Sequence, residues 1–159
     1  MPDRPDWSAV AAEALEVFRA YLRIDTSNPP GQEAPAARFL GRLLEAEGIA
    51  CEYIETAPGR EAVVARLPGD GRGGALMLAN HTDVVPVDAP FWGVPPFEGA
   101  LRDGRVYGRG AVDMKSTAVM HLFAVILAKR LGLPLRRDLV FLAVPDEEVG
   151  SSQGMAWLV

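Results

Sequence analysis

Apolar residues near the N-terminus recur at steps of three and four, which is the spacing of one face of an α-helix. This spacing predicts a helix over residues 7–23, ended by the turn-forming segment IDTSNPPG. A second helix should begin near Pro35, because proline fits a first helical turn, and should end at Gly48. Its expected inward face consists of Ala36, Phe39, Leu40, Leu43 and Leu44. Two helices therefore precede the first expected strands.

Four short apolar runs have the length and composition of β-strands: IACEYI, AVVARL, ALMLA and LVFLAV. The last run lacks polar residues, as is typical of a strand buried on both faces. Asp103 and Gly104 favour the positive backbone angles of a tight hairpin turn. A third helix is expected from Ser116 to Leu131, with Gly132 after it. These elements predict an α/β fold with a mixed or parallel sheet.

The last residues have the pattern of a helix that has only begun. Ser151 or Ser152 is a suitable N-cap for the segment GMAWLV. Several apolar residues follow with no apolar partner later in the sequence, namely Met155, Trp157, Leu158 and Val159. We therefore expect the chain to be a truncated piece of a longer protein.

The overall composition excludes some classes of partner. The 159 residues carry a net charge of −5, which provides no basic field for nucleic acid or anionic lipid. The N-terminal residues contain four acidic side chains and no long apolar run, so neither a signal peptide nor a membrane span is expected there. The single cysteine, Cys51, is expected to be a buried and unreactive thiol. A cytoplasmic location, with neither nucleic acid nor membrane as a partner, is the prediction.

Candidate chemistry lies just past the expected strands. His81 follows the apolar run ALMLAN, and an acidic triplet follows LVFLAVP. Open α/β sheets bind ligands past the carboxyl ends of their strands. If the strand continues, His81 and Asp83 point the same way, so that the carboxylate can orient the imidazole. His81 is then a candidate metal ligand, although a helix-capping or loop-stabilising pair explains this dipeptide as well.

A second candidate is Asp113 in the glycine-rich turn GRGAVDMK, just before the third expected helix. Its carboxylate could face the strand ends and bridge two cations, as dinuclear hydrolases require. An aspartate that interacts favourably with the helix macrodipole is an equally good explanation. A phosphate-binding loop is a third interpretation, but the spacing of its glycines and lysine differs from the known motif.

The triplet Asp146, Glu147 and Glu148 places three negative charges after a buried strand, which is costly unless cations or donors are near. A bound metal ion is the simplest way to balance these negative charges. One carboxylate could bind it while a neighbour accepts a proton from water. A solvated acidic turn is the alternative. His121 lies eight residues after Asp113, roughly 12 Å along a helix, which is too far to share its metal.

Three segments in order resemble the zinc-dependent exopeptidase and deacylase family of peptidase clan MH: LMLANHTDVVPVD, PPFEGALRDGRVYGRGAVDMK and VPDEEVGSSQGM. The resemblance implies two zinc ions, with cobalt or manganese as possible substitutes. It assigns a role to each of five residues. His81 would bind the first metal, Asp83 would orient His81, Asp113 would bridge both metals, Glu147 would be the general base and Glu148 would bind the second metal. It also implies a cis peptide after Asp113.

The same resemblance implies a three-layer α/β/α sandwich with a mixed central sheet. Residues 1–159 would be the N-terminal part of the catalytic domain, truncated before further ligands and before a lid and dimerisation domain. Asn80 and Ser116 stand where the family often has glycine, and neither change removes a ligand. The expected function is hydrolysis of an amide or peptide bond, with a small peptide or an N-acyl amino acid as substrate and a homodimer as the parent protein. The chain alone is expected to be inactive. The alternatives are a non-catalytic fragment or remnant and a mononuclear metallohydrolase.

Overall fold

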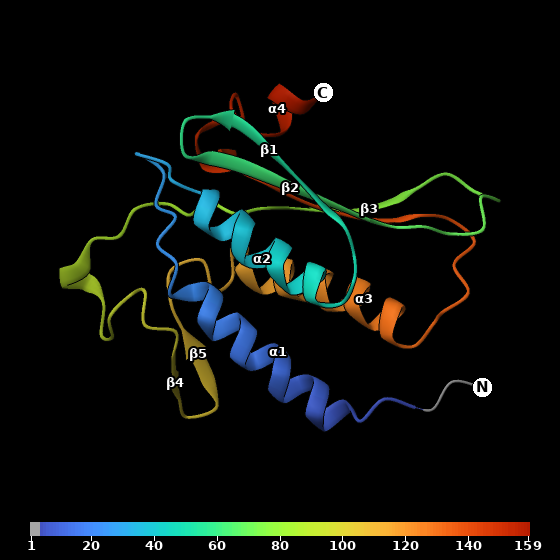
Figure 1. Ribbon diagram of the computed structural model, residues 1–159. Helices are drawn as coiled ribbons and strands as arrows, with labels where there is room; N and C mark the ends of the chain where they lie inside the picture. The colour runs from blue at the N-terminus through green and yellow to red at the C-terminus, as the bar shows by residue number, and fades with distance from the viewer. Residues whose placement is uncertain (1–3) are drawn as a thin grey trace.

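A four-stranded sheet forms the centre of the computed structural model, which describes residues 4–159 (Figure 1). Its strands are, in spatial order, β1 (Cys51–Ala57), β2 (Arg60–Leu67), β6 (Leu139–Val144) and β3 (Leu76–His81). β1 and β2 are antiparallel, as are β2 and β6, whereas β3 is parallel to β6. The predicted mixed sheet is therefore confirmed.

Helices lie on both sides of this sheet. α2 (Ala34–Ala46) packs on β1 and β2, and α3 (Lys115–Arg130) packs on β3 and β6. α1 (Trp7–Leu22) packs against α3 on the same side (Figure 1). The short α4 (Met155–Leu158) packs its Met155 and Leu158 on the opposite side of the sheet, near Leu142. The larger core thus lies between the sheet and the three long helices, and the α/β/α arrangement is that of the prediction.

The start of α1 follows from local chemistry, whereas that of α4 does not. α1 begins after Asp6, whose carboxylate accepts hydrogen bonds from the amides of Ser8 and Ala9. The expected N-cap of α4 was wrong, because the residue at that position is Gly154. Ser152 and Gln153 instead donate hydrogen bonds to the carboxylate of Asp146. These two residues are therefore bound to a carboxylate six and seven residues earlier, and the helix begins after them.

The two parallel strands end together at one edge of the sheet. His81, the last residue of β3, is in register with Val144, the last residue of β6. Residues 82–112 then leave this edge and include η1 (Ala89–Phe91) and the hairpin of β4 (Ala100–Arg102) and β5 (Arg105–Tyr107) (Figure 1). Positive φ angles at Asp103 (50°) and Gly104 (72°) confirm the predicted hairpin turn.

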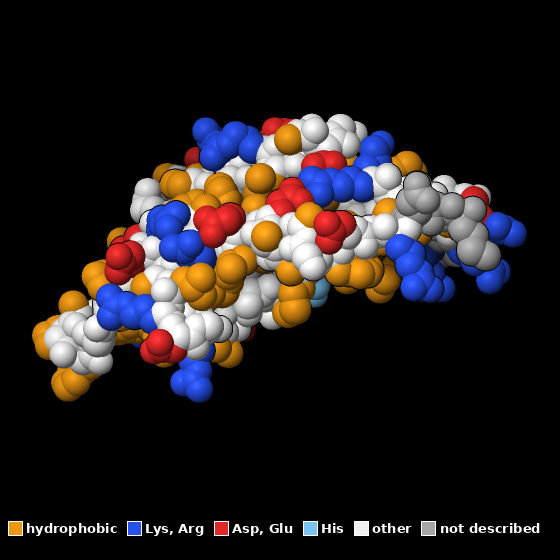
Figure 2. Space-filling model, turned by 90° about the horizontal axis from the view of Figure 1, so that it is seen from below, with side chains coloured by type: hydrophobic (Ala, Val, Ile, Leu, Met, Phe, Trp, Pro, Cys, Tyr) orange, Lys and Arg blue, Asp and Glu red, His pale blue; other side chains and the backbone are white. Residues whose placement is uncertain are grey.

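The visible surface mixes charges of both signs. On the face seen in Figure 2, acidic and basic side chains are interspersed with apolar ones. Among residues 4–159, no helix combines the length and the apolar composition that crossing a membrane requires.

Leu44 lies in the core between α2 and the sheet, where truncation of a side chain should lower the stability of the fold. Its side chain is fully buried, and the residue belongs to the larger core cluster. We expect Leu44→Ala to lower the free energy of unfolding by about 2–5 kcal/mol, because the removed methyl groups leave a cavity. Urea denaturation followed by circular dichroism measures the change. Leu101→Ala in β4, at 44% exposure, is the control and should change stability by less than about 0.5 kcal/mol. Equal losses in the two variants would contradict this picture of the core.

Candidate metal centre

Three of the predicted side chains meet at the sheet edge. His81, Asp113 and Glu148 each offer one ligand atom, and these atoms lie within 4.8 Å of one another. Nε2 of His81 lies 3.1 Å from Oδ1 of Asp113. The residues come from the end of β3, from the turn before α3 and from η2 (Glu147–Val149). Folding has therefore joined three parts of the chain around one point.

The imidazole of His81 is held from behind by Asp83. Nδ1 of His81 lies 3.3 Å from Oδ1 of Asp83 and 3.1 Å from the Asp83 backbone oxygen, which leaves Nε2 facing Asp113. Burial favours the neutral ring, but the hydrogen bonds and charges of Asp83, Asp113 and Glu147 outweigh it and raise the pKa of His81 to about 9. The ring thus sits in a strongly negative environment.

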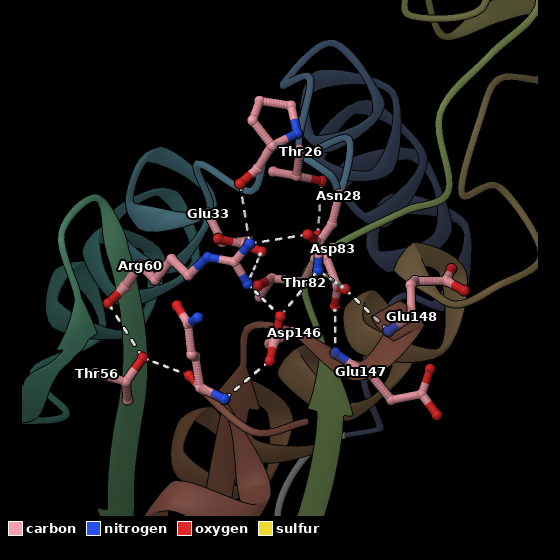
Figure 3. A network of polar contacts seen from close by, with 12 residues as sticks. Thr26, Asn28, Glu33, Thr56, Arg60, Thr82, Asp83, Asp146, Glu147 and Glu148 are labelled. Carbon is pink, nitrogen blue, oxygen red and sulfur yellow. Dashed lines mark hydrogen bonds and ion pairs between the residues drawn. The ribbon is translucent and has the colours of Figure 1, made fainter. Parts of the chain in front are cut away.

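Asp83 is fully buried, and its carboxylate joins several segments (Figure 3). It accepts hydrogen bonds from the amides of Glu147 and Glu148, both at 3.0 Å, and from Nδ2 of Asn28 at 2.9 Å. Burial opposes ionisation of this group, yet these donors and His81 lower the pKa of Asp83 below its ordinary value. One carboxylate therefore orients the imidazole and also holds the turn that carries Glu148.

The carboxylates nearest to Nε2 of His81 lie at the rim of the site. The side chains of Asp113 and Glu147 are 75% and 55% exposed, and Oε2 of Glu147 lies 3.7 Å from Nε2 of His81. Burial, together with neighbouring carboxylates, raises the pKa of the half-buried Glu148 although His81 opposes it. The peptide between Asp113 and Met114 is cis, as the resemblance implied.

The donor set fits divalent cations. One imidazole and several carboxylates surround the point, so negative groups outnumber the single histidine. Imidazole and carboxylate oxygen are ordinary ligands of zinc, and carboxylates also bind manganese. A bound cation would offset the surplus of negative charge, so the residues present are suitable for metal.

Lys115 anchors the turn that carries Asp113. The side chain is fully buried, and its Nζ donates hydrogen bonds to the backbone oxygens of Tyr21 and Ile24 at 3.2 and 2.6 Å. Burial lowers the pKa of this amine to about 7, although Asp25 opposes the shift. The beginning of α3 is thereby tied to the end of α1.

Asp146 does not share the environment of the other two members of the acidic triplet. It is 1% exposed, forms an ion pair with Arg60 and accepts a hydrogen bond from Asn28 at 3.2 Å (Figure 3). The prediction that metal compensates the whole triplet is therefore wrong for Asp146, whose compensator is a guanidinium. The sequence interpretation missed Asn28 and Arg60. Arg60 is the first residue of β2 and lies outside the expected strand AVVARL, next to Glu61, so the local pattern gave no signal of a buried pair.

Glu33 completes this buried network. Its side chain is fully buried 3.5 Å from Arg60, and neither carboxylate oxygen has a hydrogen-bond partner. Burial raises the pKa of Glu33 to about 7, against the opposing charge of Arg60. The guanidinium of Arg60 thus faces two carboxyl groups, those of Glu33 and Asp146.

Other candidate residues lie outside the cluster. His121 lies within α3 and is not among the grouped ligands of residues 4–159. Cys51 is only partly buried, not buried as expected, but this partial burial raises the pKa of its thiol to about 11, which agrees with an unreactive thiol. Trp92 lines a groove beside Phe91 and Tyr107, with the guanidinium of Arg109 5.3 Å from its ring centre.

A hollow of about 320 Å³ opens beside the cluster. Asp113 and Glu148 form part of its wall, and Val85, Ala111 and Val112 supply apolar surface. This hollow is the space in which a small molecule could reach the clustered side chains.

Sequence comparisons relate the chain to known proteins. The sequence model of peptidase family M20/M25/M40 matches residues 77–159. The chain is 40% identical to aminoacylase-1 of Sus scrofa over 148 residues, which is 92% of this chain and 36% of that protein. It therefore spans about a third of the length of this curated relative.

Solved structures match the fold as well. An M20 family metallo-carboxypeptidase from Sulfolobus solfataricus aligns with a TM-score of 0.78 at 28% identity, covering 87% of this chain and 32% of that one. A Bacillus subtilis protein described as a dinuclear metal binding peptidase from the M20 family aligns with a TM-score of 0.69 at 19% identity, covering 95% of this chain and 39% of that one. The second likeness concerns the fold alone.

The buried Glu33 generates a prediction for stability against pH. Its pKa is raised from 4.5 to about 7, so between these values the folded state holds a proton that the unfolded state releases. Stability contributed by this group is present below pH 4.5 and is lost as the pH rises toward 7. The free energy of unfolding of Glu33→Gln, relative to that of wild type, should therefore rise by up to about 3 kcal/mol between pH 4.5 and 8.

Urea denaturation of the metal-free chain at several pH values in this range measures the difference. Glu52→Gln is the matched control, since that side chain is exposed in β1, and it should change stability by less than about 0.5 kcal/mol. A difference for Glu33→Gln that stays constant, or that shrinks as the pH rises, would contradict the protonated buried state.

Proposed function

Because the chain belongs to peptidase family M20/M25/M40, whose sequence model matches residues 77–159, we propose that it carries part of the catalytic centre of a metal-dependent amide hydrolase. One observation supports this most strongly. His81, Asp113 and Glu148 lie far apart in sequence, yet their ligand atoms come within 4.8 Å of one another at one edge of the sheet. Such convergence of an imidazole and carboxylates favours metal-assisted hydrolysis.

Each residue of the proposed centre has one role. His81 and Glu148 would each hold one of two zinc ions, and Asp113 would bridge them, with cobalt or manganese as possible substitutes. Asp83 would keep Nε2 of His81 free for metal by holding Nδ1, from which it is 3.3 Å away. Bound cations would supply Lewis-acid polarisation of the scissile carbonyl.

Glu147 is the proposed general base. Its carboxylate is more than half exposed at the rim and lies 3.7 Å from Nε2 of His81, so it is next to the centre without being buried in it. In this position it would accept a proton from the attacking water and return it to the leaving amine. Its backbone amide is held by Asp83 at 3.0 Å, which limits where the side chain can reach.

We propose an N-acyl amino acid as the substrate class, with a small peptide as the second candidate. The curated relative at 40% identity is an aminoacylase, whereas the structural relative at 28% identity is a carboxypeptidase. The hollow beside Asp113 and Glu148 has apolar walls at Val85 and Val112, which suit an apolar group next to the amide.

The proposal extends to the organisation of the protein. Residues 1–159 would form the N-terminal part of a catalytic domain, and the parent protein would be a homodimer. A cytoplasmic location stays a prediction. The chain alone supplies three grouped ligands, so we expect weak metal binding and no measurable turnover from it.

Metal titration tests the ligand assignment on the chain itself. We expect wild type to bind two equivalents of zinc weakly, and His81→Ala to lower the affinity for zinc by at least about 100-fold, since loss of even a residue that only orients a metal ligand lowers metal affinity 10- to 100-fold. The chain offers a matched control in His121→Ala, the only other histidine, which should bind like wild type. Isothermal titration calorimetry gives affinity and stoichiometry. A single equivalent would favour a mononuclear site, and no binding would refute the metal centre.

A chimera tests the reaction. This chain would replace its matched segment in aminoacylase-1 of Sus scrofa, with which it shares 40% identity. We expect the chimera to hydrolyse N-acyl amino acids, and a chelator to abolish the activity. Glu147→Gln should lower kcat about 100- to 10,000-fold without loss of zinc, because it removes the general base.

Release of the free amino acid measures turnover, and dipeptides assayed in parallel compare the two substrate classes. Glu52→Gln, an exposed residue of β1, is the control and should retain activity. A zinc-loaded Glu147→Gln chimera with unchanged kcat would remove Glu147 from the proposed role. Preference for dipeptides would move the substrate class to peptides.

A further inference from the structure

We propose that Asn28 is a positioning residue for the metal centre, holding the two buried aspartates behind it at a fixed separation. The inference rests on the proposed function, because the centre that Asn28 would position is the one assigned to His81, Asp113 and Glu148. Asn28 lies in the segment between α1 and α2 and is 2% exposed.

The side chain of Asn28 connects two strand ends. Its Nδ2 donates to Oδ2 of Asp83 at 2.9 Å and to Oδ1 of Asp146 at 3.2 Å (Figure 3). Asp83 follows β3 and Asp146 follows β6, and these strands are neighbours in the sheet. An amide carries two N–H donors, so one nitrogen can serve both carboxylates.

An amide suits this position better than other side chains do. Two ionised carboxylates facing one buried point repel each other unless a donor lies between them. An aspartate at position 28 would add a third negative charge, and an aliphatic side chain would leave both carboxylates without this donor. Asparagine is neutral and short, so it satisfies both acceptors without adding charge.

Arg60 determines which way the amide faces. Its NH2 nitrogen donates to Oδ1 of Asn28 at 2.8 Å and to the backbone oxygen of Pro30 at 3.0 Å. The amide oxygen must therefore face the guanidinium, and Nδ2 must face the aspartates. Gly31 lies against this guanidinium at φ +79°, and an added Cβ would lie 1.8 Å from an Arg60 nitrogen. Residues 28–31 are thus shaped around Arg60.

Asp83 transmits the position of Asn28 to the proposed ligands. The same carboxylate faces Nδ1 of His81 and accepts the amides of Glu147 and Glu148. If Asp83 shifts, the imidazole and the turn of η2 lose a common support. Asn28 can therefore affect two proposed ligands without contacting the metal.

The backbone around Asn28 is held independently of its side chain. The Asn28 amide donates to Val84 O at 2.9 Å, and Thr26 Oγ1 donates to Thr82 O at 2.7 Å. Removing the Asn28 side chain should therefore leave this segment attached to the residues after β3. A variant can test positioning without removing the whole contact.

The experiment compares Asn28→Ala with wild type in two measurements. Without metal, amide hydrogen exchange by NMR should become at least about 10-fold faster at Glu147 and Glu148, while amides in the middle of β6 keep their relative protection. With cobalt as the probe, affinity should fall about 10- to 100-fold, and the visible absorption spectrum of the bound cobalt should change. Leu44→Ala is the control for a purely structural effect, and it should leave the cobalt spectrum unchanged.

The outcomes separate the inference from the proposed function. If wild type binds cobalt and Asn28→Ala gives the same affinity, spectrum and exchange, the positioning role is overturned while the metal centre stands. If wild type fails to bind cobalt, the proposed function fails, and exchange at Glu147 and Glu148 still decides whether Asn28 holds the turn. If Asn28→Ala does not fold, Asn28→Ser, which keeps one donor, is measured in its place. We then expect a loss of cobalt affinity and of amide protection that is smaller than the loss stated for Asn28→Ala. Wild-type values in Asn28→Ser would overturn the positioning role.

Discussion

The buried carboxylate of Asp83 imposes the requirement around which this sheet edge is organised. A charged group that is fully removed from water must be surrounded by donors, or its burial costs several kcal/mol. Here the donors are the amides of Glu147 and Glu148 and the side chain of Asn28, with the ring of His81 beside them. Satisfying one carboxylate thus draws together the ends of β3 and β6 and the segment after α1.

This requirement separates the acidic residues into two groups. Asp146 faces inward, where Arg60 and Asn28 neutralise and bind it. Asp113 and Glu147 face outward next to His81, with no arginine or lysine within ion-pair distance of either among residues 4–159. The charge of Asp146 is therefore balanced without metal. Asp113 and Glu147 carry the surplus of negative charge that a bound cation would balance. Asp146 and Glu147, which are neighbours along the chain, therefore lie in different environments: the first beside a guanidinium, the second beside an imidazole.

The local patterns were sufficient for most elements. Periodicity identified α1, α2 and α3 to within a residue or two, and the apolar run of β6 was identified from Leu139 to Val144. These segments form because their own residues bury a face or a whole strand. The predicted start of α4 was wrong because Ser152 and Gln153 donate to the carboxylate of Asp146, six and seven residues earlier in the chain, and the helix begins after them.

The candidate ligands could be inferred from order along the chain, since His81, Asp113 and Glu148 each stand where a strand or turn ends and the motifs around them resemble a known family. Their common point, and the separation of Asp146 from Glu147 and Glu148, became known only with the three-dimensional arrangement. Arg60 and Asp146 are 86 positions apart, and Asn28 and Asp146 are 118 apart. Burial and charge pairing act through space, so a linear pattern can identify groups that need partners, but the packing of the sheet selects which partners they find.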